Sequence, residues 1–279
     1  MSKRASFPMD YDKYAPTYAW SRHAVPWVIR PLAEIVAALL AGAAVLEIGC
    51  GTGNYVNALA NIRPNIAYFG FDLSESMLSE ARACGRRVTF KAGDAAKEFP
   101  FPDRRFSLAF AVDVVHHIGN LRRFFAEAQR VLVSGGHLLI VTDSEETLRQ
   151  RSLTVYFPEI LPVELARYPR IAQLDDSAVR AGLDIASQSI TEGYIPLDPE
   201  FLAKLEAKCS SSMRLITSEQ HAAGMNRIRA AAARGDQWLS RYDVLHYVRP
   251  RRVPSSLNAD ALDSEEPARA DSLGYGFRR

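Results

Sequence analysis

The 279-residue sequence lacks the features that mark several protein classes. It has three cysteines, Cys50, Cys84 and Cys209, and their spacing fits neither a disulfide scaffold nor a zinc site. The longest largely apolar stretch, residues 32–46, contains Glu34 and is shorter than the ~20 residues that a membrane-spanning helix needs. The first residues contain no apolar segment of an export signal. We therefore expect a cytoplasmic protein with no metal site and no membrane association.

An excess of charge of one sign is also missing. The sequence has 34 Lys and Arg against 32 Asp and Glu, and its arginine pairs are scattered along the chain. This balance excludes a strong field for steering nucleic acid, so no nucleic-acid partner is expected. The apolar fraction of 48% and the charged fraction of 24% are typical of a globular protein with one large or two small domains.

Short apolar segments alternate with helical patterns through the first half of the chain. The segments read as strands that are apolar throughout, which requires helices on both faces of a parallel sheet. Two further strand patterns follow near the C-terminus. We therefore predict an α/β fold with a Rossmann-like, doubly wound, seven-stranded and mostly parallel sheet. The expected strands are 44–48, 67–71, 88–91, 106–112, 138–141, 185–191 and 244–248.

The remaining segments give the expected domain organisation. Residues 1–31 are rich in aromatics and proline and are predicted to form an N-terminal helical lid. The main domain is expected over 32–249, with helical cap insertions near 145–180 and 195–240 that build the substrate pocket. Residues 250–279 are poor in aliphatic side chains and are predicted to be a disordered tail.

A glycine-rich loop follows the first expected strand. Gly49, Gly51 and Gly53 permit a tight turn and close approach of a ligand, although a turn without a ligand is the alternative. A dinucleotide fingerprint would need glycine where Asn54 stands. Glu47 would repel a pyrophosphate and attract an ammonium group. The loop therefore favours a ligand that is cationic on this side.

Acidic residues also follow the next two expected strands. Asp72 lies where a carboxylate can accept both hydroxyls of a ribose. Asp94 can accept from an exocyclic adenine amine, and the N–H of Ala95 can bond a ring nitrogen. One acid at a strand end can be a helix cap or turn former, but three at successive strand ends indicate a ligand.

These segments resemble the class I S-adenosylmethionine-dependent methyltransferases of the small-molecule, methyltransferase domain 11-like type. Residues 47–54 resemble their first motif, E/D-x-G-x-G-x-G, and residues 72–78 resemble their ribose-binding segment. Residues 93–95 are similar to the adenine-binding segment. Residues 130–136 are similar to the R-x-L-x-P-G-G turn, with Ser134 in place of proline. The resemblance implies S-adenosylmethionine as cofactor, S-adenosylhomocysteine as product, and no metal.

The resemblance also implies roles for individual residues. The methionine moiety would lie on Gly49, Gly51 and Gly53, with its ammonium group near Glu47, and Asp72 would hold the ribose. Residues 11–18 resemble the Y-D-x-x-A-x-x-Y lid pattern, although a helix packing its tyrosines on the core is the alternative. The other implied cofactor contacts are Leu73 and Met77 beside the adenine, Asp94 and Ala95 at its edge, Val112 and Asp113 near the sulfonium, and Tyr11 and Tyr18 over the cofactor.

The expected catalytic residues follow the fourth and fifth strands. Residues 113–118 resemble the family's L-H-H-I/V stretch, and imidazole titrates near neutral pH. We expect one histidine to face the pocket and one to pack, and we favour His117 over His116 as general base. Asp143 is a candidate orienting residue or second base. Catalysis by proximity alone, with both histidines structural, is the alternative.

The acceptor is expected to be a small molecule resembling a secondary metabolite, methylated by in-line displacement on O, N or C. The N/D-P-P-Y/F tetrapeptide of DNA amino-methyltransferases is missing. Aromatic and Met side chains in the expected cap would suit a partly apolar acceptor. A tRNA- or protein-modifying methyltransferase, or a cofactor-binding protein without methyl transfer, are the alternatives. The protein is expected to be a monomer or homodimer.

Overall fold

The structure is a computed structural model that describes residues 20–21, 23–84 and 87–251. Tyr11, Tyr18 and most of the predicted lid lie outside the described residues, as does the predicted tail beyond Arg251. Within the described part, no helix has the length and apolar character needed to cross a membrane. The same residues contain no cluster of three or more His, Cys, Asp or Glu side chains that could hold a metal ion.

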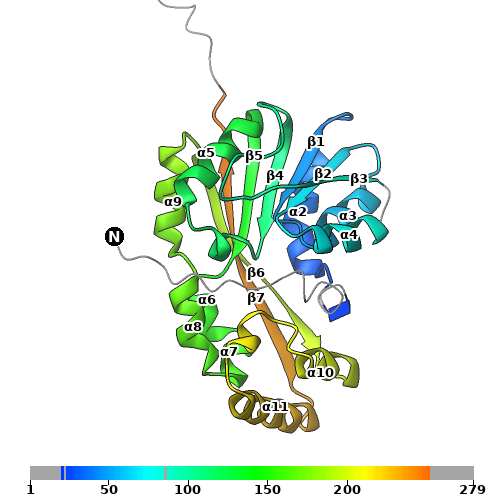
Figure 1. The fold of residues 1–279 in the computed structure, drawn as a ribbon, viewed down its shortest axis with the longest axis vertical. Coiled ribbons are helices and arrows are strands. Elements are labelled where there is room, and N and C mark those ends of the chain that lie inside the picture. The colour runs from blue at the N-terminus through cyan, green and yellow to red at the C-terminus, as the bar shows by residue number, and fades with distance from the viewer. Residues whose placement is uncertain (1–19, 22, 85–86, 252–279) are drawn as a thin grey trace, which may run out of the picture.

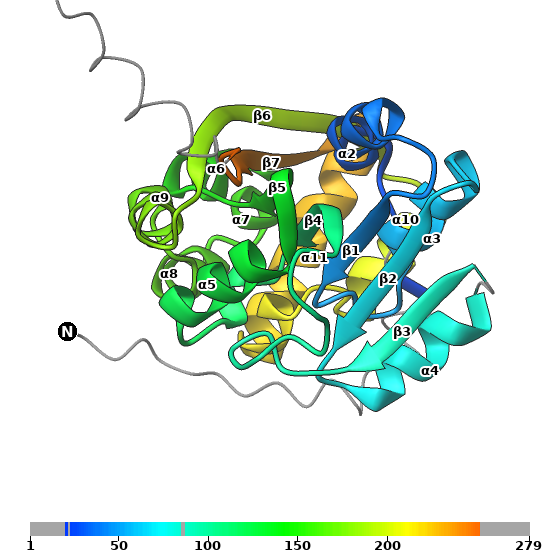
Figure 2. The same cartoon turned by 90° about the horizontal axis from the view of Figure 1, so that it is seen from above.

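The described strands form one seven-stranded sheet in the order β3-β2-β1-β4-β5-β7-β6 (Figures 1 and 2). The first five strands pair in parallel, and β7 runs antiparallel to both β5 and β6. This confirms the predicted Rossmann-like, mostly parallel sheet. The order reverses between β1 and β4, and open α/β sheets generally bind their ligands at such a point, beyond the carboxyl ends of the strands. The strands are β1 (Ala44–Ile48), β2 (Ala67–Asp72), β3 (Val88–Ala92), β4 (Phe106–Val112), β5 (Leu132–Thr142), β6 (Asp184–Pro196) and β7 (Gln237–Val248).

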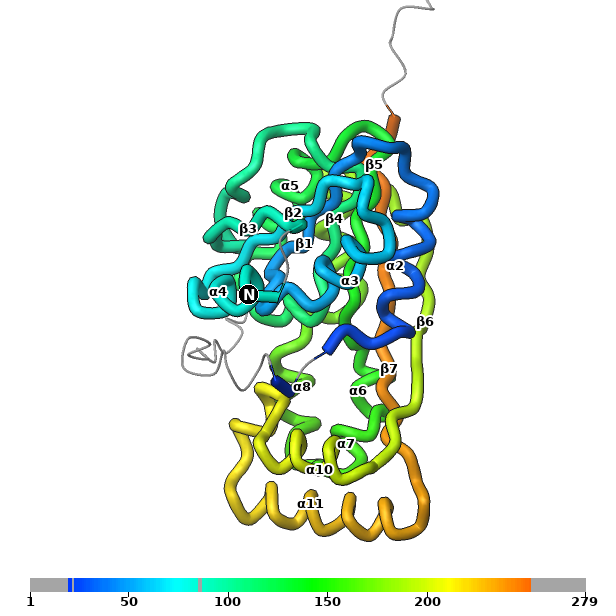
Figure 3. Tube along the Cα trace, turned by 90° about the vertical axis from the view of Figure 1, so that its right-hand side faces the viewer, coloured from blue at the N-terminus to red at the C-terminus, as the bar shows by residue number. Residues whose placement is uncertain are grey.

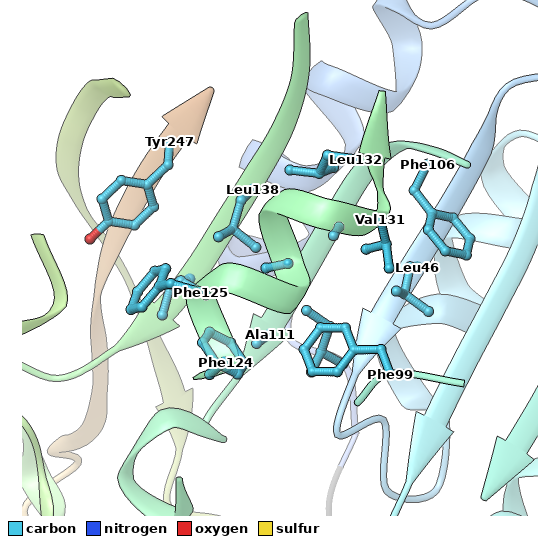
Figure 4. Close-up of a cluster of buried hydrophobic side chains, with 14 of the residues drawn as sticks. Leu46, Phe99, Phe106, Ala111, Phe124, Phe125, Val131, Leu132, Leu138 and Tyr247 are labelled. Atoms are coloured by element: carbon cyan, nitrogen blue, oxygen red, sulfur yellow. The ribbon is translucent and has the colours of Figure 1, made fainter. Parts of the chain in front are cut away.

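Helices cover both faces of the sheet. On one face, α2 (Pro26–Ala38) and α3 (Asn54–Ile62) bury their apolar sides against β1, β2 and β4. On the other, α5 (Leu121–Val131) and α9 (Ile171–Arg180) enclose an aromatic-rich core. Figure 4 shows Phe124 and Phe125 of α5 in this core, with the Phe125 ring 5.6 Å from that of Tyr247 on β7. α4 (Glu75–Cys84) packs against β2 and β3. The sheet is thereby fixed as a rigid base for its loops.

The helix α2 begins at Pro26, before the predicted start of the main domain at residue 32. Pro26 occupies its first turn, where a missing N–H costs nothing, and the helix then runs through Pro31. Proline at 31 leaves the carbonyl of Trp27 without its helical donor. The hydroxyl of Thr191 on β6 donates to that carbonyl at 2.6 Å. A tertiary contact thus replaces the hydrogen bond that Pro31 removes, and the helix crosses the predicted boundary between lid and domain.

A helical cap lies beyond the carboxyl ends of the strands (Figures 1 and 3). The ladder of β6 and β7 continues from Asp184 opposite Val248 to Pro196 opposite Gln237, well past the end of β5, and carries the cap. The strands are longer than predicted because this extension pairs strand with strand outside the main sheet. The cap consists of α6 (Glu145–Gln150), α7 (Ser152–Tyr156), α8 (Ile160–Arg167), α10 (Pro199–Glu206), η2 (Ser212–Arg214) and α11 (Ser218–Ala233).

The cap has its own hydrophobic core. Phe157, Met213 and Met225 are almost completely buried there, together with Trp238 from β7. These aromatic and methionine side chains therefore stabilise the cap, and the surface that it turns to the strand ends is formed by other residues.

The chain beyond β7 returns to the turn that precedes the main part of β5. The N–H of Gly135 donates to the carbonyl of Arg249 at 2.8 Å, and the Ser134 hydroxyl donates to Pro250 at 3.2 Å. The Arg249 guanidinium donates to carbonyls at the C-terminal end of α5, where a cation is favourable. Residues 249 and 250 therefore pack on the domain.

Candidate active site

The glycine loop between β1 and α3 passes close to the end of β4. Gly49, Gly51 and Gly53 have φ angles of +66°, +51° and +72°. A Cβ atom at Gly49 would lie 2.7 Å from a methyl group of Val114, and one at Gly53 would lie 2.9 Å from the Phe90 ring. Glycine is needed at both positions for conformation and for space. The three glycines thus let the loop turn tightly while it packs against Val114 and Phe90.

Asp72, at the end of β2, is held against this loop. Its Oδ2 accepts from the N–H of Gly51 at 2.8 Å, and its Oδ1 accepts from the N–H of Ser74 at 2.9 Å. Ser74 in turn caps α4, since its hydroxyl accepts from the N–H of Met77 at 3.1 Å. Each carboxylate oxygen has a second lone pair, so Asp72 can still accept from a diol.

Glu47 lies beneath the loop and is only 3% exposed. Its Oε2 accepts from the N–H of Val56 in α3 at 3.0 Å. Burial, together with the nearby Asp72, raises the pKa of the Glu47 carboxyl above its usual range. The hydroxyl of Thr52 in the same loop is buried, and no described residue hydrogen-bonds it. A ligand with an ammonium group and a further polar group would satisfy both side chains.

The next strand ends provide an apolar surface and a second carboxylate. Leu73 is 73% exposed, which is unusual for a leucine, whereas Met77 in α4 is buried. The Asp94 carboxylate accepts from the N–H of Ala96 at 2.9 Å and lies 3.4 Å from the Lys97 ammonium. Leu73 therefore offers an exposed apolar surface on which a flat ring could pack.

The end of β4 carries the histidine pair. Asp113 has a positive φ of 56°, a strained value for a residue other than glycine, and it precedes the short helix η1 (Val115–His117). The ring of His116 stacks on Tyr168, with centroids 4.2 Å apart, and lies 4.0 Å from the His117 ring. The Tyr168 hydroxyl donates to Asp113 Oδ1 at 3.4 Å. The cap therefore contacts the strand end where Val112 is half-buried.

The two histidines differ in environment. His117 is exposed to solvent, whereas His116 is half-buried. Loss of hydration beside neighbouring residues and the charge of Arg167 lower the pKa of His117 to about 4, against a raising effect of Asp113. His117 is therefore neutral at physiological pH and reaches solvent, while His116 packs between two rings.

Four charged side chains form a buried cluster behind the histidines. Arg151 binds the Asp143 carboxylate and lies 2.7 Å from Glu164 Oε2. The other Glu164 oxygen is 3.5 Å from Arg167, whose guanidinium also donates to the hydroxyl of Ser211 at 3.2 Å. Asp143 is thus placed as a partner of Arg151, and its Oδ1 has no hydrogen-bond partner among the described residues.

Of this cluster the sequence singled out Asp143 alone, and Tyr168 counted only among the aromatic side chains of the expected cap. Glu164 and Arg167 are spaced as an ordinary surface pair on a helix, and spacing carries no information on burial. Both are at most 4% exposed in the fold. Tyr168 directly follows α8, and only the packing of the cap brings it to His116.

Comparisons with known proteins agree with this geometry. Residues 46–140 match the family model described as a methyltransferase domain. The chain is 30% identical to demethylmenaquinone methyltransferase of Chlorobaculum parvum over 169 residues, which is 57% of this chain and 69% of the relative.

Solved structures share the fold at lower sequence identity. A protein of Anabaena variabilis named for a methyltransferase of an antibiotic biosynthesis pathway superposes with a TM-score of 0.63 at 18% identity, covering 81% of this chain and 98% of that one. Phosphoethanolamine N-methyltransferase 2 of Haemonchus contortus, solved with phosphomonomethylethanolamine and S-adenosylhomocysteine, gives 0.57 at 19% identity, covering 90% and 61%. At these sequence identities, the two solved structures show that this chain shares their fold.

Proposed function

The chain belongs to the class I S-adenosylmethionine-dependent methyltransferases, and we propose that it methylates an oxygen, nitrogen or carbon atom of a small-molecule acceptor. When bound, S-adenosylmethionine supplies an electrophilic methyl group on a sulfonium. Three features fit its methionine moiety: the buried Glu47, the buried Thr52 hydroxyl that no described residue hydrogen-bonds, and the glycine loop. Binding of the ammonium group near Glu47 would favour the ionised carboxyl that burial alone disfavours.

The nucleoside part of the cofactor fits the neighbouring strand ends. Asp72 keeps acceptor capacity for the two ribose hydroxyls while two backbone N–H groups fix its position. The exposed Leu73 would pack on one face of the adenine, with Met77 behind it. Asp94 and Ala95 would read the adenine edge.

On the acceptor side, Val112 and Asp113 would flank the sulfonium. The Asp113 carboxylate provides a negative charge at the end of β4, and the Tyr168 hydroxyl orients it. Burial and the nearby Asp113 charge raise the pKa of Tyr168 above its usual range, so the tyrosine stays protonated and remains a donor. In this proposal Tyr11 and Tyr18 would close the site from the lid.

The observation that carries the small-molecule proposal is the contact of the cap with the end of β4. Tyr168 of the cap stacks on His116 and bonds Asp113, so the cap covers the position to which the methyl group would be delivered. A covered site of this kind suits a small acceptor better than a tRNA or a folded protein.

In this proposal, His117 acts as the general base when the acceptor atom carries a proton that must be removed. Its solvent-facing ring is neutral at physiological pH and can accept a proton on a ring nitrogen. His116 would position Tyr168 by stacking. The orienting role expected of Asp143 would act through Arg151 and Glu164, since its carboxylate binds Arg151. Most of the rate would come from holding the acceptor in line with the methyl group.

The test is a transfer assay with S-adenosylmethionine labelled in its methyl group. The purified chain is incubated in parallel with a metabolite fraction, total RNA and bulk protein. The same three incubations are run with the His117→Ala variant. We expect label in small molecules, lost in the variant. Label in RNA or protein would support the alternative acceptors, and cofactor binding without any transfer would support a binding protein.

Two further expectations belong to this proposal. We propose a cytoplasmic location and a monomeric or homodimeric state, without a nucleic-acid partner. Cell fractionation and analytical ultracentrifugation with and without RNA test these statements directly.

A further inference from the structure

The strand β6 forms one edge of the sheet over its whole length. It has 13 residues and pairs with β7 on one side, and no other described strand lies on its second side. Figure 3 shows β6 along one margin of the molecule. No turn, loop or cap of the described chain hydrogen-bonds to the backbone of residues 184–196. The outer side of β6 therefore presents a row of backbone donors and acceptors to which another strand can bind.

The two edges of the sheet differ in their protection against such pairing. Edge strands are commonly protected by shortness, by lysine or proline, or by bulges. The strand at the opposite edge, β3, has five residues and carries Lys91. In contrast, β6 contains no Lys or Arg, and its proline, Pro196, is its last residue. Its pairing with β7 is regular apart from a register shift between Ile185 and Ser187. The longer edge is thus the less protected one.

Three large apolar side chains are exposed on this strand. Ile185, Ile190 and Tyr194 are 46%, 47% and 57% exposed. Their partners in β7 follow at every fourth residue, so the three side chains lie on the same face of the sheet. Side chains from a pairing strand would remove part of this apolar surface from water, which is favourable.

The sequence of β6 is complementary to itself in one antiparallel register. A two-fold axis at Ile190 would place this residue opposite its counterpart in a second copy of the chain. Gln188 would then lie opposite Glu192, and Ser189 opposite Thr191. Apolar would face apolar and hydroxyl would face hydroxyl, and both kinds of pair stabilise a sheet.

Neighbouring registers are less favourable. An axis at residue 192 would place Glu192 opposite itself, and an axis at residue 188 would bring Asp184 beside Glu192. Like charges in opposite positions are destabilising. An axis at residue 189 or 191 would place Ile190 opposite Gln188 or Glu192. Charge and apolar pairing therefore favour the axis at Ile190.

The other face of the strand is compatible with the same register. Trp27 of α2 lies over Gly193, where an added Cβ atom would be 2.0 Å from the indole ring. With the axis at Ile190, the residue opposite Gly193 is Ser187. This small side chain would not compete with the indole for space.

We propose that two copies of this chain form a homodimer in which their β6 strands pair antiparallel about a two-fold axis at Ile190. The pairing joins two seven-stranded sheets into one continuous sheet and bonds the outer backbone groups of both strands. The assembly closes at two copies, because each copy uses its β6 edge once. β6 and the strands of the glycine loop and Asp72 lie toward opposite ends of the sheet order, so cofactor binding does not depend on this dimer.

The first experiment is sedimentation equilibrium of the full chain over a wide range of concentrations. We expect a monomer–dimer equilibrium. Ile190→Lys and Ile190→Glu each place like charges at the axis and should weaken the dimer about tenfold or more. An equal mixture of the two variants should dimerise again, because opposite charges then meet at the axis. Ile62→Lys is the matched control, since Ile62 is an exposed isoleucine at the end of α3.

The second experiment tests the register by cross-linking. Residues directly opposite in antiparallel strands have Cα atoms about 4.5–5.5 Å apart, within the range of a disulfide. Ile190→Cys should therefore give a disulfide-linked dimer on oxidation, and Ile62→Cys should not. Both are made with Cys84→Ser, because Cys84 is exposed.

Several results would overturn the proposal. A chain that stays monomeric at every concentration excludes the dimer, and a dimer that Ile190→Lys leaves unchanged excludes this interface. A mixture of the Lys and Glu variants that remains monomeric, or Ile190→Cys that does not cross-link, excludes the axis at Ile190. Binding of S-adenosylhomocysteine should be unchanged in every variant, so that its loss in the wild-type chain would contradict the proposed function alone.

Discussion

Replacing Asp72 by asparagine tests the proposed cofactor site most directly. The amide has nearly the same shape, but its nitrogen cannot accept from the N–H of Gly51 or Ser74, nor from a ribose hydroxyl. A hydrogen bond to a charged group contributes about 1.5–3 kcal/mol. Losing one such bond to the ribose should weaken cofactor binding by about 10- to 150-fold.

The same change should have a small effect on folding. The carboxylate links the glycine loop to the start of α4, and a net loss of about 1 kcal/mol lowers the melting temperature by about 2–4 °C in a domain of this size. Affinity for S-adenosylhomocysteine is measured by calorimetry, because the product does not turn over. Asp184→Asn, at the exposed start of β6, is the control. A folded Asp72→Asn protein with wild-type affinity would refute the assignment of Asp72.

Three further predictions concern the histidine variants, the pH dependence of turnover and the packing of the cap. His117→Ala should lower turnover about 10²–10⁴-fold at unchanged cofactor affinity. His116→Ala should mainly weaken the packing of Tyr168. Wild-type turnover in both variants would exclude a histidine base. Because the His117 pKa is lowered to about 4, the base stays neutral above that pH, so turnover should be constant from pH 6 to 8 and should fall only as the pH approaches 4. Gly224→Ala should destabilise the cap by about 1–3 kcal/mol, although such a change usually stabilises a helix, because the new Cβ would lie 2.0 Å from the Phe157 ring. Thermal unfolding measures this, with Gly119→Ala as the unobstructed control; a higher melting temperature for Gly224→Ala would contradict the packing of Phe157.

The sequence by itself determined the sheet and the expected cofactor positions. Runs such as residues 44–48 and 106–112 are largely apolar because both faces of these strands are covered, and the structure has strands with these bounds. The glycines and acids follow the strands within a few residues, so their proximity in the fold is a consequence of parallel strand order. Local pattern was therefore sufficient to place the glycine loop and these acids at the ends of neighbouring strands.

Only the tertiary structure decided the acceptor side. Arg167 and Tyr168 are distant in sequence from the histidine pair, and packing of the cap on β4 brings Tyr168 to His116. The same packing removes Arg167 and Glu164 from water, although their spacing is typical of an exposed helix. It also buries Phe157, Met213 and Met225 in the core of the cap. For any single aromatic or Met side chain of the cap, sequence reasoning favoured such a core position over an acceptor contact. Burial and long-range contact depend on how whole elements pack, and the order of residues along one element does not encode either.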